Sequence, residues 1–386
     1  MAWPRDDAKL DRVRGLMAEQ GLDAIVARAP DNVLYLTNFW GMKGWDAVCF
    51  PREGEPTLLC LEASADDAAR TAWTSDVRLV PGYLPDDPRP PVVRTLAELG
   101  FAREYGTVGL ELSLGTQASD RMVGEPTTYT KAWFDAFPEA IDATSLLAEA
   151  RAIKTEQELE RLRLANEIAA AAMDHVVGVI RPGMTEAQIA SEWLGFVHGE
   201  GTGWGGKVEL ALGFSLVWAG PGIKTFTATT SRPVVDDEPT LFEIWVCADG
   251  YWADHTKNVV VGELTDRYRE LEAGLREVYD DAVTFCVPGA SLAELDRRVR
   301  GGVERLGYPG QPTHPICHGV GARAHEPPYA HQAGGGEMAA GMVLAIEPGC
   351  YWPEGGGLRL EDNFLISADG AEKLSPFPDG IVQAAA

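Results

Sequence analysis

The sequence is short of positive charge and of cysteine, and it has no long hydrophobic run. Lysine and arginine total 33 against 58 aspartates and glutamates, for a net charge of −25. Nucleic acid is therefore not an expected partner, because nucleic-acid-binding proteins present basic surfaces. The six cysteines lie far apart without CxxC spacing, which is typical of small core residues in a reducing compartment. No stretch approaches the roughly 18 apolar residues of a membrane span, and the charged N-terminus lacks the apolar segment of a signal peptide. We expect a cytoplasmic protein with no membrane partner.

The patterns that are present predict two domains. The length of 386 residues is enough for two or three domains. Residues 7–20 have helical spacing and are followed by Gly21, while residues 22–27 and 32–37 have the composition of strands. A capping box of Thr155 and Glu158 begins a long helix that should reach residue 180. We therefore expect an α/β domain over residues 1–150 and a second domain over residues 151–386.

The second domain contains a weak internal repeat. Each copy is a helix, a Pro-Gly break, a capping signal (Thr185 with Gln188, then Ser291 with Glu294) and a second helix. A strand-rich stretch with one pair of acids follows each copy. The simplest interpretation is a duplicated α+β unit whose two halves face each other across a sheet.

Each pair of acids lies where hairpin pairing would bring its members together. Strand-forming residues flank the turn 248–250, and a turn centred between residues 248 and 249 makes Glu243 and Asp254 direct cross-strand neighbours. In the same way, strands over 343–346 and 358–364 would place Glu347 opposite Glu361. Acids clustered at strand centres repel one another unless a cation, a shared proton or a cationic substrate lies between them.

The glycine-rich segment 318–328 adds His318 and His325 to the four acids. Oxygen ligands with one nitrogen suit Mn²⁺, Fe²⁺, Co²⁺ or Zn²⁺, and two carboxylates could bridge two such ions. One histidine could bind the metal while the other donates a hydrogen bond to a tetrahedral oxyanion. The aromatic loop 38–45, with Trp40 and Trp45, fits a binding lid and a packed domain interface equally well.

Several ordered stretches resemble the creatinase/prolidase/methionine-aminopeptidase family of pita-bread hydrolases. They are RVRGLMAEQGLDAIVARAPDNVLYLTNF (12–39), ARAIKTEQELERLRLAN (150–166), GYWADHTKNVVVG (250–262), HGVGARAHEPP (318–328), AIEPGCY (345–351) and GLRLEDNFLIS (357–367). The resemblance covers nearly the whole chain. It implies a creatinase-type N-terminal α/β domain and a C-terminal pita-bread α+β domain with an internal pseudo-twofold repeat.

The resemblance also implies roles for individual residues. Asp254, His318, Glu347 and Glu361 match family metal ligands, and His325 matches the histidine that contacts the substrate carbonyl or the intermediate. Glu347 would be the general acid/base, with His318 and His325 as the other catalytic residues. The sequence departs from the family twice: Glu243 stands where the family has its first metal-binding aspartate, and Phe226 where it has a second histidine. Four residues are expected to bind the substrate: Phe226, Trp40, Trp45 and Arg323.

The implied function is hydrolysis of a C–N bond by metal-activated water, as in Xaa-Pro dipeptidases and aminopeptidases. One or two divalent ions (Mn, Co, Zn or Fe) are expected, although the two departures are also compatible with a metal-independent amidohydrolase of the creatinase or ectoine hydrolase type. A catalytically dead binding protein of the same fold is the third alternative. The expected partners are a short peptide or small molecule and a second copy of the chain, whose Trp40–Trp45 loop would help to shape the pocket.

Overall fold

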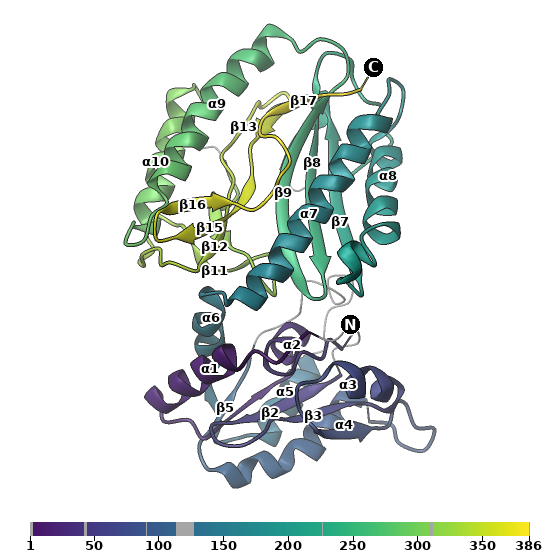
Figure 1. Ribbon diagram of the computed structural model, residues 1–386, viewed down its shortest axis with the longest axis vertical. Coiled ribbons are helices and arrows are strands. Elements are labelled where there is room, and N and C mark those ends of the chain that lie inside the picture. Colours follow the sequence, from purple (N-terminus) through teal and green to yellow (C-terminus); the bar gives the residue numbers. More distant parts are fainter. Residues whose placement is uncertain are drawn as a thin grey trace. The chain divides into compact units, whose positions relative to one another are not determined.

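The chain folds as two compact units, Met1–Arg151 and Ala152–Ala386. The computed structural model describes residues 3–41, 45–89, 91–112, 127–225, 227–308 and 312–385, with the side chains of 127–130 left aside. Figure 1 shows a mixture of helices and strands in both units. Within these residues, no helix combines the length and the hydrophobicity needed to span a bilayer.

The first unit is built on a six-stranded mixed sheet in the order β4-β3-β2-β1-β5-β6. Its strands are β1 (Ala24–Ala27), β2 (Ala47–Pro51), β3 (Thr57–Leu61), β4 (Asp76–Val80), β5 (Val108–Leu110) and β6 (Ile141–Asp142). Its helices are α1 (Asp7–Glu19), α2 (Pro30–Thr37), α3 (Ala65–Thr71), α4 (Pro91–Glu98), α5 (Thr127–Ala136) and α6 (Thr144–Ala152). Alternate residues of β1 enter two different cores, Ile25 with α1 and Val26 with α4, so the central strand is buried on both faces.

One prediction for this unit is wrong. Residues 32–37 form most of the helix α2 and not a second strand. Pro30 lies at the start of the helix, where a missing N–H has no cost, and Asp31 occupies the first turn. Asn38 then ends the helix in the left-handed conformation, with φ of 61°. The apolar residues of this segment had the composition of a strand, but the flanking helix signals decide its structure.

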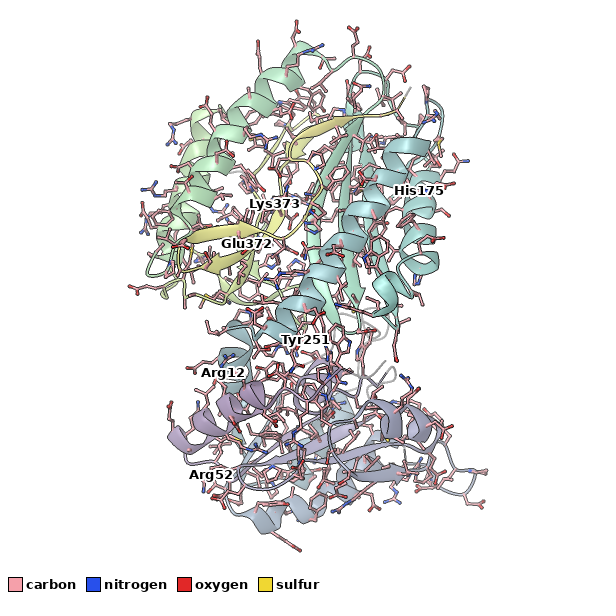
Figure 2. The ribbon with its side chains drawn as sticks, viewed as in Figure 1. Arg12, Arg52, His175, Tyr251, Glu372 and Lys373 are labelled. Carbon is pink, nitrogen blue, oxygen red and sulfur yellow. The ribbon has the colours of Figure 1, made fainter. Side chains whose placement is uncertain are left out.

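The first half of the second unit is a four-stranded sheet covered by two helices. The strands are β7 (Ala211–Ala219), β8 (Pro239–Ala248), β9 (Tyr251–Val260) and β17 (Ile381–Gln383), in the order β17-β9-β8-β7. The helices α7 (Glu156–Val179) and α8 (Glu186–Gly199) pack beside this sheet (Figure 1). Capping boxes at Thr155 and Thr185 begin them, as predicted. Tyr251, labelled in Figure 2, ties β9 to the first turn of α7 by donating a 2.9 Å hydrogen bond to Glu158.

The second half repeats this plan. The helices α9 (Asp266–Phe285) and α10 (Leu292–Arg305) precede a five-stranded sheet in the order β11-β10-β12-β15-β16. Its strands are β10 (Cys317–Gly319), β11 (Glu326–Tyr329), β12 (Val343–Ile346), β15 (Asp362–Ser367) and β16 (Gly370–Lys373), beside the small hairpin of β13 (Gly349–Tyr351) and β14 (Gly357–Arg359). An isolated bridge between Thr256 and Glu361 links β9 to the segment just before β15. The expected fold class, with its repeated helix–helix–sheet halves, is confirmed.

Candidate metal centre

The first pair of acids lies on one face of the β8–β9 hairpin, but the predicted pairing is wrong. Glu243 lies opposite Thr256, and Asp254 lies opposite Trp245. The turn consists of Asp249 and Gly250, with φ of 46° and 87°, so the two-residue loop begins one position later than expected. Because side chains alternate between faces, Glu243 and Asp254 still share a face, as diagonal neighbours.

The second pair of acids lies just beyond the pairing of β12 with β15. The last paired residues are Ile346 and Asp362, so the same antiparallel register leads next to Glu347 and Glu361. Neither acid belongs to a strand, so their direct pairing stays a prediction, although their donor atoms lie within 4.8 Å of each other. The expected single strand over 358–364 is instead divided into β14 and β15, and Glu361 lies in the break between them.

His318 on β10 completes the cluster. Its Nε2 atom lies 3.4 Å from Oε1 of Glu347 and 3.6 Å from Oδ2 of Asp254. His325 precedes β11, and its Nε2 atom lies 3.5 Å from the same Asp254 oxygen. The donor atoms form three overlapping groups whose members lie within 4.8 Å of one another: Asp254 with His318 and His325, His318 with Glu347 and Glu361, and Glu243 with Asp254 and Glu361. The structure therefore brings all five predicted ligands and His325 into one cluster.

Burial and mutual repulsion dominate the electrostatics of the cluster. Burial, followed by the charge of Glu361, raises the pKa of Asp254 well above its ordinary value. Burial and Glu347 raise the pKa of Glu361 in the same way. Burial also opposes the charge of Glu347, but His314 and His318 outweigh it and lower the pKa of Glu347 to about 2. Burial would lower the pKa of His318, yet Glu347 and Asp254 raise it to about 9. The cluster attracts protons because it holds too little positive charge.

The residues present fit a divalent cation. Both carboxylate oxygens of Asp254 and Nε2 of His318 are buried without a hydrogen-bond partner among the described residues. Buried polar atoms normally have hydrogen-bond partners, and a bound ion is one of the standard explanations for exceptions. Carboxylate oxygens with one imidazole nitrogen are the donors that Mn²⁺, Co²⁺, Zn²⁺ and Fe²⁺ accept.

Three further residues contact the acids, a fourth contacts one of these three, and all four were missed from the sequence. Arg359 forms an ion pair with Glu243, and its Nε atom donates a 2.5 Å hydrogen bond to Thr256. Thr256 in turn donates to Glu361 at 2.6 Å. Nδ1 of His314 lies 3.1 Å from Glu347, and its Nε2 lies 3.1 Å from the hydroxyl of Tyr351. Two signals could have found part of this set. Arg359 is two residues before Glu361, and Thr256 two residues after Asp254, which places each pair on one face of an extended segment.

A buried ion pair anchors the loop that carries His325. Nζ of Lys154 lies 2.9 Å from Oε1 of Glu326, and the two side chains are only 1% and 2% exposed. A Cβ atom on Gly321 would lie 2.3 Å from the same Glu326 oxygen, so the turn needs glycine there. Glu326 is the direct neighbour of His325, and its fixed side chain limits where the imidazole can lie.

The structure gives no test of the four predicted substrate-binding residues. Phe226 lies outside the described residues, as does the middle of the 38–45 loop. Trp40 and Trp45 belong to the first unit, where the Trp45 ring packs edge-on against Tyr83 with 5.4 Å between centroids. Arg323 lies two residues before His325, and its carbonyl accepts a 2.9 Å hydrogen bond from Gly321. Their binding roles stay predictions.

Comparisons with known proteins agree with this geometry. The model of metallopeptidase family M24 matches residues 160–368, and that of the creatinase/prolidase N-terminal domain matches residues 9–153. An Xaa-Pro dipeptidase of Lactobacillus delbrueckii subsp. lactis is 27% identical over 94% of this chain and 95% of its own length. Among solved structures, a prolidase from Pyrococcus horikoshii superposes with a TM-score of 0.79 at 22% identity, covering 96% of this chain and 99% of that one. An X-Pro aminopeptidase from Thermotoga maritima gives 0.80 at 21%, covering 97% and 99%. The resemblance inferred from the motifs is thereby confirmed.

Proposed function

We propose, because this chain belongs to metallopeptidase family M24, that it hydrolyses the peptide bond before proline in dipeptides or short peptides. Family membership identifies the chain as a hydrolase of peptide C–N bonds, and the dipeptidase and prolidase names of its relatives support the proline specificity. The observation that carries the proposal is the convergence of four carboxylates and His318 in one cluster, with Asp254 fully buried inside it.

We assign the metal to Glu243, Asp254, His318, Glu347 and Glu361. A divalent ion (Mn, Co, Zn or Fe), in one or two copies, would polarise the scissile carbonyl and lower the pKa of water. The carboxylate of Glu347 is ionised, so it can take the proton of the attacking water and pass it to the leaving nitrogen. His325 has the most exposed side chain of the cluster, at 30%, and from that position it can donate a hydrogen bond to the developing oxyanion.

The test is hydrolysis of Ala-Pro by the purified protein, before and after chelation and with each metal added back. Cleavage that is lost on chelation and restored by one of the four ions supports the proposal. Cleavage of Ala-Ala at the same rate as Ala-Pro would refute the proline specificity. Lack of any dipeptide cleavage in the metal-loaded protein would refute the peptidase assignment.

One observation favours a second candidate, a metal-independent amidohydrolase of a small molecule. Arg359 already pairs with Glu243, so the chain itself supplies one positive charge to the acidic cluster. In this alternative the acids would hold a cationic substrate. Activity that is unchanged by complete removal of metal would favour it over the peptidase.

The proposal extends to the oligomeric state, the domain boundary, the substrate contacts and the compartment. The family resemblance supports a homodimer, a creatinase-like domain over 1–150 and a catalytic domain over 151–386, and it supports substrate contacts for Phe226, Trp40, Trp45 and Arg323. The division of the chain at Arg151 agrees with that boundary. All six cysteines are free and buried, which supports a reducing, cytoplasmic compartment.

A further inference from the structure

A row of side chains crosses the four-stranded sheet of the second unit, from its edge strand β7 to the candidate metal centre. Phe214 on β7 lies opposite Trp245 on β8, and Trp245 lies opposite Asp254 on β9. Cross-strand neighbours point to the same face of a sheet. The two aromatic rings therefore lie on the face that carries Asp254 and Glu243, and not on the face that α7 and α8 cover.

The same row borders the opening of the site. The side chains of Asp254, His318 and Glu361 are at most 1% exposed, whereas that of His325 is 30% exposed. The ring centroid of Trp245 lies 6.2 Å from that of His325 and 5.2 Å from that of Phe214. The Trp245 ring thus neighbours both the exposed imidazole of His325 and the Phe214 ring.

Sheet packing alone does not account for Phe214. Trp245 is nearly buried, at 6% exposure, but Phe214 remains 42% exposed on an edge strand. The exposed ring of Phe214 lies next to the nearly buried ring of Trp245, and together they form an apolar surface beside the reacting groups. Apolar surfaces in binding sites usually contact an apolar part of the ligand.

We propose that Phe214 and Trp245 form the subsite for the side chain of the residue before the scissile bond, and that this side chain is flat and apolar. The inference rests on the proposed function, because it takes the substrate to be an Xaa-Pro dipeptide. The proline residue of such a dipeptide carries the free carboxylate, which needs a positive partner. Neither ring offers one, and Asp254 at the end of the row would repel it, so the row takes the first residue and not the proline.

The test compares Phe-Pro with Ala-Pro in the metal-loaded full chain. The unaltered protein should prefer Phe-Pro, and Phe214→Ala should lower kcat/KM for Phe-Pro by roughly two- to tenfold, the effect of one lost ring contact. The same variant should leave kcat/KM for Ala-Pro within about twofold, since alanine does not reach the ring. The matched control is Phe134→Ala, an equally exposed phenylalanine of the first unit at 49%, which should change neither value. Equal losses for both dipeptides, or no loss for Phe-Pro, would overturn the subsite.

A binding measurement separates this inference from the proposed function. Glu347→Gln should stop turnover, so calorimetry on this variant gives Kd values for both dipeptides without cleavage. A tighter Kd for Phe-Pro that disappears in the double variant with Phe214→Ala supports the subsite. Equal Kd values for the two dipeptides refute it, even if Xaa-Pro cleavage is established. If the unaltered protein cleaves neither dipeptide, the proposed function is wrong and the same Kd comparison still decides the subsite.

Discussion

The strand β9 carries buried charged side chains on both faces, and the two faces differ in how their charges are balanced. On the site face, four carboxylates lie around one guanidinium, that of Arg359. On the back face, Lys257 and Lys373 lie close to Asp362 and Asp379, so two carboxylates meet two ammonium groups. Lys373, labelled in Figure 2, reaches this back-face cluster from the end of β16.

Whether the pKa of an acid in these clusters is raised or lowered depends on the nearby positive charge and not on how deeply the acid is buried. Asp362 is as buried as its neighbour Glu361. Burial alone would raise the pKa of both, yet Lys257 and His255 lower the pKa of Asp362 far below its ordinary value, while the pKa of Glu361 is raised. The pKa values of two adjacent residues, Glu361 and Asp362, are therefore shifted in opposite directions. The site face is short of positive charge, which is the condition that a cation site requires.

The largest expected effect comes from removing an acid of the site face. Glu361→Ala should remove metal binding and lower activity by about 10⁴-fold, or roughly 5 kcal/mol of barrier, because a metal ligand and the charge of the site are lost together. Metal content by elemental analysis and the rate of dipeptide hydrolysis check it. Glu372→Ala is the control, since Glu372 is an exposed acid on the adjacent strand β16. Full metal content and turnover in Glu361→Ala would contradict the ligand assignment.

On the back face, removing a cation should act on stability instead. Lys257→Met removes the nearer ammonium partner of the buried Asp362 and leaves the more distant one, Lys373. It should lower the free energy of unfolding by about 3 kcal/mol, the lower end of the usual cost of breaking a buried pair, because Lys373 remains. Lys207→Met removes a similar ion pair with Glu160 at 2.5 Å, in which both side chains are about half exposed, and should cost less than about 1 kcal/mol. Denaturant unfolding of both variants measures the difference. Equal losses of stability would mean that the buried ion pair on the back face contributes no more than the exposed one.

Local signals in the sequence predicted the helices and strands that carry the two faces. The capping boxes at Thr155 and Thr185 and the Pro-Gly breaks depend on residues three or four positions apart, so they could be interpreted without the fold. The acids were noticed because charged residues within apolar strands are unusual. The family motifs, which occur in the expected order along the chain, then linked these acids to a metal site.

The errors and omissions arose where distant residues decide the structure. The register of the β8–β9 hairpin depends on which two residues adopt positive φ, and Asp249-Gly250 fits this need better than the earlier position. Arg359 meets Glu243 across 116 positions, and Lys257 meets Asp362 across 105. Neither contact has a sequence signal of its own, so the balance of charge on the two faces became visible only in the structure.

Asp46 in the first unit shows how far burial alone shifts the pKa of an acid, since none of the described residues supplies it with a counter-charge. Burial raises the pKa of Asp46 to about 6, against a backbone hydrogen bond from Leu61 that lowers it. The folded state therefore binds more protons than the unfolded state between pH 4 and 6, and stability should fall as pH rises through this range, by about 3 kcal/mol in all. Asp46→Asn should abolish this part of the pH dependence. A difference between the two unfolding free energies that stays constant from pH 4 to 7 would contradict the shift.

The smallest effect should come from changing the acid that pairs with Arg359 on the site face. The Glu243 carboxylate reaches Arg359, and aspartate, which is one methylene shorter, would withdraw from the guanidinium toward Asp254. Glu243→Asp should therefore raise metal affinity, by about tenfold or 1.4 kcal/mol, because a carboxylate freed from Arg359 can serve an ion. Glu243→Gln keeps the length without the charge and should bind metal more weakly than the unaltered protein. Calorimetric titration with Mn²⁺ should rank the three as aspartate, glutamate and glutamine. If aspartate and glutamate bind the ion equally well, the pairing with Arg359 does not limit the site, and the deficit of positive charge on this face is filled by the metal alone.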